Sequence, residues 1–333
     1  MDEQWNHKIF NLNNEGFEAL ALEVFNFQAQ NNAVYRDFVH ALQITPSSVR
    51  SLPQIPFLPI RFFKSHEVRA GEFEPQTVFE SSGTTGSISS RHFVKDLALY
   101  EESFAKGFEF FYGSVKNYCI IGLLPSYLEK KACLPAGRNS SLVYMVDKLI
   151  QLSEHPQNGF YLNEYEQLAT VLQELEKREH KTLLIGVTFA LLDFAEQFSF
   201  PLEHTFVMET GGMKGRKREM IREEVHALLK KSFSLDEIHS EYGMTELLSQ
   251  AYSKEKGIFN CPPWLKILMR DEEDPFLIKY EGPGTINVID LANIFSCSFI
   301  ATDDVGKLYP DGSFEVLGRV GGSDLRGCSL MIV

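Results

Sequence analysis

The chain has 333 residues, 44% of them hydrophobic, which is enough for one large or two ordinary domains around a sizeable core. Its formal net charge of −13 argues against nucleic acid or an anionic membrane surface as the main partner. The sequence contains no signal peptide or membrane-length apolar run, and its five cysteines form no Cys-x-x-Cys pair, so we expect a cytoplasmic protein with reduced thiols.

The first part of the chain is predicted to be helical and then extended. Apolar residues recur at helical spacing within residues 14–43, and a second short helix is expected within 35–42. Four prolines between positions 46 and 59 exclude helix from most of the following segment. This extended segment is either a connector that wraps the core or one wall of a pocket for an acyl group.

A run of hydroxyl-bearing residues and glycines follows the strand-like residues 77–80 and precedes a predicted helix over 96–111. Glycine permits unusual backbone angles and close approach, so such a loop can direct several backbone N–H groups and hydroxyls at phosphate oxygens. Taken alone, the loop fits a plain surface turn equally well, and it lacks the Walker pattern. It consists of Ser81, Ser82, Gly83, Thr84, Thr85, Gly86 and Ser87.

Strand-like and helix-like segments alternate from residue 118 to residue 246, which predicts a mostly parallel sheet with crossover helices. Gly211 and Gly212 follow a predicted strand, which is where open α/β sheets bind ligands. Residues 142–150 fit either a strand or a short helix. The predicted strands are 118–124, 182–187 and 204–208, and the predicted helices are 163–180 with Asn163 as N-cap, 190–198 and 216–233.

The last part of the chain predicts a smaller β-rich subdomain. Its short, turn-separated β segments are 264–269, 284–291, 296–301 and 312–317. We therefore expect an α/β fold in three regions. They are a helical and proline-rich segment packed on the core (1–75), an α/β nucleotide-binding core (76–260), and the β-rich subdomain with a C-terminal tail (261–333).

Three further motifs follow the hydroxyl-rich loop in chain order. His239-Ser240-Glu241-Tyr242-Gly243-Met244-Thr245-Glu246 comes first, Ala301-Thr302-Asp303-Asp304-Val305-Gly306 second and Gly318-Arg319 third. The four ordered motifs resemble those of the adenylate-forming superfamily, which contains acyl-CoA ligases and luciferase-type enzymes. The short chain, the Pro-Phe-Leu-Pro sequence at 56–59 and the Arg-Gly-Cys sequence at 326–328 are most similar to the acyl-protein synthetases of the LuxE family.

The resemblance implies ATP and Mg²⁺ as cofactors and gives roles to individual residues. The loop 81–86 would hold the β- and γ-phosphates, and Gly211 and Gly212 would let the backbone approach the nucleotide. Taken singly, Tyr242 also fits a core aromatic, Glu246 a solvated helix start, and His239 a buried, hydrogen-bonded position. The implied roles are adenine stacking for Tyr242 beside Gly243, α-phosphate contact for Thr245, Mg²⁺ binding for Glu246, and ribose contact for Asp304 and Arg319.

Cys328 lies near the C-terminus, where the family carries its acyl group on a cysteine. Arg326 would favour the thiolate form of this residue. The alternative is an incidental small residue in a terminal strand. The chain departs from the adenylate-forming pattern in three ways: Ser89 replaces the usual loop lysine, no aspartate follows Gly-Arg, and the chain stops at Val333, so we expect the lid domain to be absent.

The leading hypothesis is an ATP-dependent acyl-protein synthetase. It would activate a carboxylic acid, with a fatty acid expected, as acyl-AMP and move the acyl group to Cys328. A partner protein such as a reductase would then accept the acyl group. Two alternatives stay open, namely an acyl-CoA ligase core without its lid and a non-catalytic nucleotide-binding scaffold. Neither a nucleic-acid partner nor a membrane span is expected.

Overall fold

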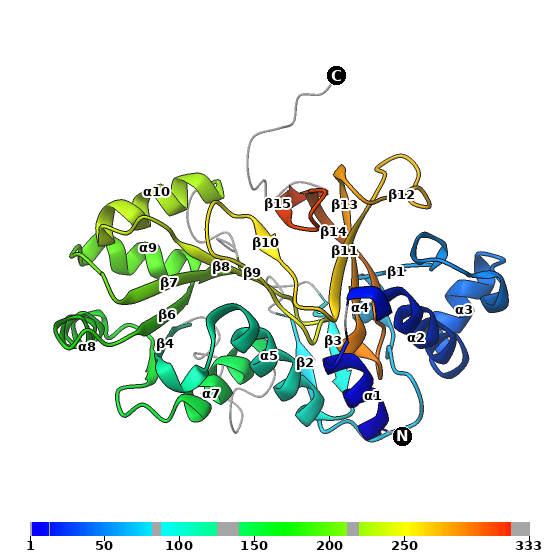
Figure 1. The fold of residues 1–333 in the computed structure, drawn as a ribbon, viewed down its shortest axis with the longest axis horizontal. Helices are drawn as coiled ribbons and strands as arrows, with labels where there is room; N and C mark the ends of the chain where they lie inside the picture. The colour runs from blue at the N-terminus through cyan, green and yellow to red at the C-terminus, as the bar shows by residue number, and fades with distance from the viewer. Residues whose placement is uncertain (1, 13, 82–87, 125–139, 212–219, 321–333) are drawn as a thin grey trace.

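The structure is a computed structural model that describes residues 2–12, 14–81, 88–124, 140–211 and 220–320. Figure 1 shows an elongated molecule with two differently built ends. Parallel strands flanked by α7, α8, α9 and α10 form one end. Antiparallel strands flanked by α1, α2 and α3 form the other. In the described part of the chain, no helix is both long and apolar enough to cross a membrane.

Five parallel strands form the core of the first end, in the order β5-β4-β6-β7-β8. Every residue of β4 and β6 is buried, as expected for parallel strands covered on both faces. The three strands predicted in this region are confirmed. The bounds are β4 Cys119–Leu123, β5 Gly159–Tyr161, β6 Thr182–Val187, β7 Thr205–Thr210 and β8 His239–Tyr242.

Helices cover both faces of these strands. Figure 1 shows α9 and α10 on one face and α5 and α7 on the opposite face. Residues 142–150 belong to helix α7, which resolves the open choice there. The helix bounds are α5 Leu97–Tyr112, α7 Ser141–Ser153, α8 Tyr165–Lys177, α9 Thr188–Gln197 and α10 Arg222–Phe233.

The predicted N-cap of α8 was wrong. The helix begins at Tyr165 rather than after Asn163, and its N-cap Glu164 makes no side-chain capping bond. The Glu164 carboxylate instead accepts hydrogen bonds from the backbone N–H of Leu162 (2.8 Å) and of Asn163 (3.1 Å). These two bonds hold the preceding turn together, so the helix starts after them.

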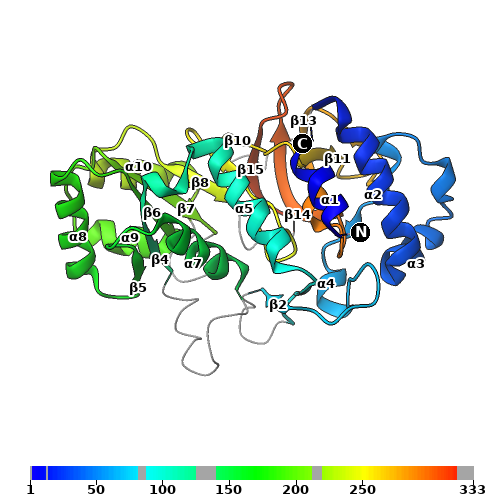
Figure 2. The same cartoon turned by 60° about the horizontal axis from the view of Figure 1, so that its bottom comes forward.

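The antiparallel strands continue the same sheet, in the order β8-β9-β10-β15-β14-β13-β11-β12. The predicted β-rich region is therefore hydrogen-bonded to the parallel core through β9 and β10. Figure 2 shows β8, β10 and β15 near one another in the middle of the molecule. Strand β14 extends well beyond the predicted 296–301, so Asp303 and Asp304 lie inside it. The bounds are β9 Ala251–Ser253, β10 Phe259–Asn260, β11 Leu265–Arg270, β12 Ile278–Lys279, β13 Gly282–Asp290, β14 Phe299–Leu308 and β15 Phe314–Arg319.

The N-terminal segment packs on β14 through aromatic rings and on the turn before β14 through one buried amide. The rings of Phe25, Tyr35 and Phe57 surround Phe299, with centroids 6.1 to 6.3 Å away. Buried Gln28 donates from Nε2 to the carbonyl oxygen of Asn293 over 3.1 Å. Strand β1, Leu58–Pro59, adds a parallel pairing to β14. The helices here are α1 Asp2–Phe10, α2 Phe17–Asn31, α3 Ala33–Ala41 and α4 Phe62–Ser65.

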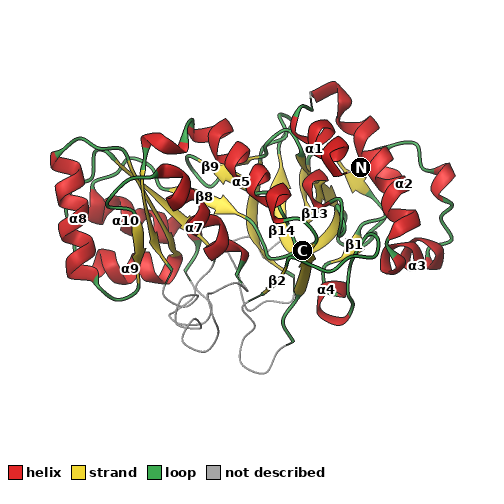
Figure 3. Cartoon of the chain, turned by 90° about the horizontal axis from the view of Figure 1, so that it is seen from below, coloured by secondary structure: helices red, strands yellow, loops and turns green. Residues whose placement is uncertain are grey.

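A separate two-stranded hairpin lies between the two ends of the molecule (Figure 3). It consists of β2, Thr77–Glu80, and β3, Arg91–Val94. These strands flank the hydroxyl-rich loop. Short 3₁₀ helices cover Asn14–Gly16, Pro46–Ser48, Leu52–Gln54, Val115–Asn117 and Leu291–Asn293.

Candidate active site

Three motif residues from three strands meet in one hydrogen-bonded group. Tyr242, at the end of β8, donates its hydroxyl to Oδ2 of Asp304 over 2.9 Å. Arg319, at the end of β15, donates from Nε to Oδ1 of the same carboxylate over 2.9 Å. Asp304 and Arg319 are register partners on neighbouring antiparallel strands, so the ladder itself sets their distance. The structure thus joins the second, third and fourth motifs at one carboxylate.

Neighbouring aromatic rings hold Tyr242 in this group. The Tyr242 ring is nearly buried and contacts Phe259 and Phe314, with centroids 5.9 and 5.5 Å away. The Arg319 side chain is 53% exposed, whereas that of Asp304 is 10% exposed. A carboxylate has about four acceptor positions, so Asp304 can still accept from ribose hydroxyls. The expected ribose contact therefore fits the geometry, and the adenine-stacking role of Tyr242 stays a prediction.

Thr245 and Glu246 follow β8 and are held by their backbone oxygens. Asn293 donates from Nδ2 to the Glu246 carbonyl over 2.7 Å, and His92 Nδ1 lies 2.8 Å from the Thr245 carbonyl. Burial lowers the pKa of His92 to about 4, so its ring is neutral at pH 7. Because a carbonyl can only accept, Nδ1 must carry the ring proton and donate. His92 thereby anchors the motif to strand β3.

The Glu246 carboxyl group is 5% exposed and lies beside the base of the hydroxyl-rich loop. Burial raises its pKa, while a hydrogen bond from the Ser90 side chain and the charges of Arg319 and Lys64 lower it. Ser90 is tied to Ser81 by two hydrogen bonds, Ser81 N to Ser90 O (3.0 Å) and Ser90 N to Ser81 Oγ (2.8 Å). Glu246 therefore stands where the ends of the loop meet.

The residue types present here fit Mg²⁺ bound together with a nucleotide. Within the described ranges, no group of three or more His, Cys, Asp and Glu is placed to hold a metal ion. Mg²⁺ in nucleotide sites is commonly bound through one or two carboxylates plus substrate phosphates and water. Glu246 is the one motif carboxylate next to the loop base, which suits that mode.

Glu209 holds together the carboxyl ends of the parallel strands. Its Oε1 accepts from Arg222 Nε and from Ser240 Oγ, each over 3.0 Å, and its Oε2 accepts from Thr188 Oγ1 over 2.9 Å. Thr188 also donates to the carbonyl of Gly211, which has φ +71°. The residue types at 209 and 222 gave no sign of this network, because a single charged residue in a strand or helix is normally solvated.

Glu241 is a second buried carboxyl group that the motif analysis did not single out. It accepts a hydrogen bond from Thr210 Oγ1, and burial raises its pKa to about 7. A Cβ at Gly243 would lie 2.3 Å from Glu241 Oε1, so a larger residue at position 243 would have to displace this carboxyl group. His239 on the same strand is a buried core histidine, with its Nδ1 3.1 Å from the Tyr112 hydroxyl.

Several predicted site residues lie outside the described residues. They are Ser82, Gly83, Thr84, Thr85, Gly86, Gly212 and Cys328. The described members, Ser81, Gly211, Tyr242, Gly243, Thr245, Glu246, Asp304 and Arg319, all lie at strand ends, in adjoining turns or, for Asp304, inside β14.

The fold is similar to that of several solved ligases. A structure of MatB from Rhodopseudomonas palustris with bound ATP has a TM-score of 0.53 and 15% identity, covering 73% of this chain and 47% of that one. A 2-hydroxyisobutyryl-CoA ligase in complex with 2-HIB-AMP and CoA has a TM-score of 0.64 and 12% identity, covering 91% and 74%. The fold is that of the adenylate-forming ligases.

The sequence places the chain more narrowly. Residues 10–333 match the family described as acyl-protein synthetase, LuxE, and the chain belongs to that family. None of the curated proteins compared with it matches. The chain spans about half the length of the MatB structures it resembles.

Proposed function

We propose that this protein is an ATP-dependent acyl-protein synthetase that activates a carboxylic acid as acyl-AMP and transfers the acyl group to the Cys328 thiol. The observation that carries the proposal is the meeting of Tyr242, Asp304 and Arg319 at one carboxylate, with Glu246 beside the loop base. Family membership supports the same reaction. A fatty acid is the expected substrate, and a reductase is a candidate acceptor.

In the first step, a carboxylate oxygen attacks the α-phosphorus of ATP, and the bond to the bridging oxygen breaks to release pyrophosphate. The protein mainly positions the two reactants and stabilises charge. Asp304 would bind the ribose hydroxyls with Arg319, and Thr245 would contact the α-phosphate. Glu246 would hold Mg²⁺, which neutralises phosphate charge when bound.

In the second step, the thiolate of Cys328 attacks the acyl carbonyl carbon. The carbon–oxygen bond to AMP breaks, AMP leaves with that oxygen, and a thioester forms. The thiol proton passes to solvent or a base, because the thiolate is the nucleophile. A partner protein with its own nucleophile would then accept the acyl group.

An exchange screen tests the first step. The intact protein would be incubated with ATP, Mg²⁺, radioactive pyrophosphate and saturated straight-chain acids of increasing length, and label entering ATP would be counted. We expect acid-dependent exchange that is strongest for longer chains. Absence of exchange with every acid would contradict the proposal and favour a nucleotide-binding scaffold.

Coenzyme A separates the two ligase mechanisms. A protein synthetase should form a protein-bound thioester from labelled acid and ATP without coenzyme A. If labelled product forms only when coenzyme A is added and is found as acyl-CoA, the protein is an acyl-CoA ligase instead.

A further inference from the structure

A cavity of about 660 Å³ lies between the proline-rich segment and the antiparallel end of the sheet. Its walls come from residues 38–61, from the β11–β12 hairpin and from one face of β13 and β14. This volume falls in the range of about 300 to 1,000 Å³ that small-molecule sites occupy. We propose that the cavity is a second acyl site, which binds the alkyl chain of a fatty acyl group with its carbonyl oxygen against Arg270.

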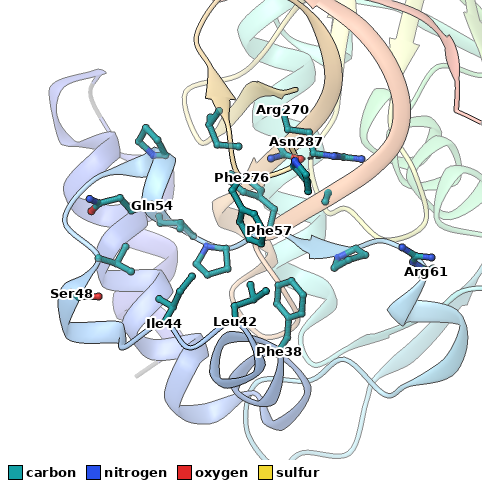
Figure 4. A pocket seen from close by; sticks show the side chains of 18 of the residues that line it. Phe38, Leu42, Ile44, Ser48, Gln54, Phe57, Arg61, Arg270, Phe276 and Asn287 are labelled. Carbon is teal, nitrogen blue, oxygen red and sulfur yellow. Dashed lines mark hydrogen bonds between the residues drawn. The ribbon is translucent and has the colours of Figure 1, made fainter. Parts of the chain in front are cut away.

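This proposal rests on the proposed function, because that reaction handles such acyl groups. The residues themselves carry the argument. Figure 4 shows an apolar end with Phe38, Leu42 and Ile44, and a polar end with Arg270 and Asn287. An alkyl chain with a carbonyl at one end has the same polarity. Each buried CH₂ raises affinity about fourfold, so a cavity of this volume favours long chains.

The polar end carries hydrogen-bond donors in fixed positions. Arg270 donates from Nη1 to Asn287 Oδ1 over 2.7 Å and to the Ile286 carbonyl over 3.2 Å, and from Nη2 to the Thr302 carbonyl. The bond to Oδ1 fixes the orientation of the Asn287 amide. Its Nδ2 is buried and has no hydrogen-bond partner among the described residues. Such a donor is rare in a folded protein, and a carbonyl acceptor at this end would satisfy the local surplus of donors.

The charged residues that line the cavity suit a ligand with a carbonyl group better than one with a cationic head group. Arg270 and Arg61 line the cavity, and Asp303 is the acidic residue among the described lining residues. Summed over these lining residues, the balance is therefore one positive charge, with Arg61 drawn apart from Arg270 in Figure 4. It attracts a carboxylate and also accepts an uncharged ester or thioester carbonyl, whereas a cationic head group would be repelled.

The hairpin between β11 and β12 exposes large apolar side chains at the edge of the cavity. Phe276 is 63% exposed and still lines the cavity, and the neighbouring Leu277 in the same hairpin is 51% exposed. Apolar side chains gathered on one hairpin are typical of a binding edge. Phe276 and Phe57 both line the cavity, so a chain bound there would cover part of the Phe276 ring from solvent (Figure 4).

The cavity is separate from the nucleotide-binding residues. Side chains alternate across a strand, and Ala301 and Asp303 of β14 line the cavity. Asp304 points to the other face, where it accepts from Tyr242 and Arg319. An acyl chain in the cavity therefore lies on the opposite face of β14 from Asp304 and its partners, where adenylation is proposed. The chain in the cavity is thus a different one from that of the acid being adenylated.

Two sources can supply the same acyl chemistry, the free acid and the acyl group on Cys328. The Val320 N–H donates to the Asp303 carbonyl over 2.8 Å, so the chain leaves β15 beside the cavity. Eight Cα-to-Cα steps join Val320 to Cys328. Their contour length is at most about 29 Å, which permits either source.

Binding without ATP tests the site directly. Equilibrium dialysis would measure labelled dodecanoate on the intact protein and on Ile44→Glu, with Leu228→Glu as control. Leu228 is a 45% exposed leucine on α10 and does not line the cavity. A carboxylate at the apolar end should lower affinity about tenfold or more, because it would have to be desolvated beside the chain. The control should bind like the unaltered protein.

A second pair removes an aromatic ring instead of adding a charge. Phe276→Ser should weaken binding several-fold. Phe110→Ser should not, and it is the matched control because Phe110, on α5, is 60% exposed and does not line the cavity. Thermal melting would verify that all four variants are folded. Unchanged binding in both Ile44→Glu and Phe276→Ser would overturn the assignment.

Pyrophosphate exchange distinguishes this proposal from the proposed function. The cavity variants should keep the KM for the acid in exchange, because the chain is bound across β14. A rise in this KM that matches the loss of binding would overturn the second site and place the substrate chain in the cavity. Cavity-dependent binding with no exchange for any acid would contradict the proposed function alone.

Comparing the unaltered protein with Cys328→Ser shows which of the two sources supplies the acyl group. A fluorescent probe, 1-anilinonaphthalene-8-sulfonate, would report free cavities after incubation with acid and ATP and removal of unbound acid. Loss of probe binding in the unaltered protein but not in Cys328→Ser identifies the protein-bound acyl group as occupant. Direct displacement of the probe by free acid, equal in both proteins, identifies the free acid. Probe binding that neither treatment changes would overturn the proposal.

Discussion

Tyr242 and Asp304 lie 62 positions apart in the sequence, yet the Tyr242 hydroxyl donates to Asp304 Oδ2 over 2.9 Å. The bond links the end of parallel strand β8 to antiparallel strand β14. It joins two motifs that the ladder alone does not bring together, since β9, β10 and β15 lie between these strands in the sheet.

Replacing this tyrosine with phenylalanine tests the link. Tyr242→Phe keeps the ring but leaves one oxygen of a nearly buried carboxylate without its donor. A hydrogen bond to a charged group contributes about 1.5–3 kcal/mol, so we expect a loss of this size in the free energy of unfolding. The KM for ATP should rise about tenfold if Asp304 binds ribose. Denaturant unfolding and the ATP dependence of exchange would measure both effects, with Tyr280→Phe, on a 54% exposed tyrosine, as control.

Glu246→Gln tests the metal assignment. The amide has nearly the same shape as the carboxylate but cannot supply a negative oxygen to Mg²⁺. We expect pyrophosphate exchange to fall about 10²- to 10³-fold, as for other lost charge-stabilising groups, while the melting temperature changes little. Glu223→Gln on the exposed side of α10 is the control. Near-normal exchange in Glu246→Gln would remove this residue from the site.

Glu241 predicts a pH dependence of stability. The pKa of this carboxyl group is about 7 in the folded protein, above its ordinary value of 4.5. Between pH 4.5 and pH 7, Glu241 therefore keeps its proton in the folded protein and has lost it in the unfolded chain. The stabilisation is complete below pH 4.5 and is lost as the pH rises towards 7, by about 3 kcal/mol in total. The lowered pKa values of His92 and His239 give the opposite slope below pH 6.5.

The test therefore compares two proteins. The difference in unfolding free energy between Glu241→Gln and the unaltered protein should change by a few kcal/mol from pH 4.5 to pH 7.5. The glutamine variant gains relative stability as the pH rises. A difference that does not vary with pH would contradict the assignment, and Glu223→Gln should show no such variation.

Much of the fold follows from local pattern. The runs at 182–187 and 118–124 are almost entirely apolar because both faces are covered, and that pattern can be recognised in the sequence. The single sheet from β5 to β12 could not be read in the same way. Strands β9 and β10 have only three and two residues, and their pairing depends on distant partners.

Those residues of the candidate site that belong to a motif could be predicted from the sequence. Asp304 and Arg319 were identified from motif order, and their register pairing on β14 and β15 brings them together. Glu209 and Glu241 were not identified, because their importance lies in burial and in partners from other strands. Neither property has a local signal in one sequence.

Adenylation and acyl transfer should depend on different residues, and Cys328 should be needed for acyl transfer alone. Cys328→Ser leaves Glu246, Asp304 and Arg319 unchanged, so acid-dependent pyrophosphate exchange should persist. The protein-bound label formed from radioactive acid and ATP should be lost. A serine hydroxyl without a base is a weak nucleophile, and any oxygen ester formed would resist hydroxylamine, which cleaves a thioester readily.

The three cysteines that the structure describes are poor carriers for a physical reason. Burial raises the pKa of Cys119 and of Cys297 to about 12, and it also raises the pKa of the half-buried Cys261. The thiolate is the nucleophile, so these thiols react slowly at neutral pH. Cys261→Ser, the least buried of the three, is the matched control and should retain the label. Label that persists in Cys328→Ser with intact exchange would assign the carrier role to another cysteine. Loss of exchange together with the label would mean that Cys328 belongs to the adenylation site, and the two-step mechanism would be wrong.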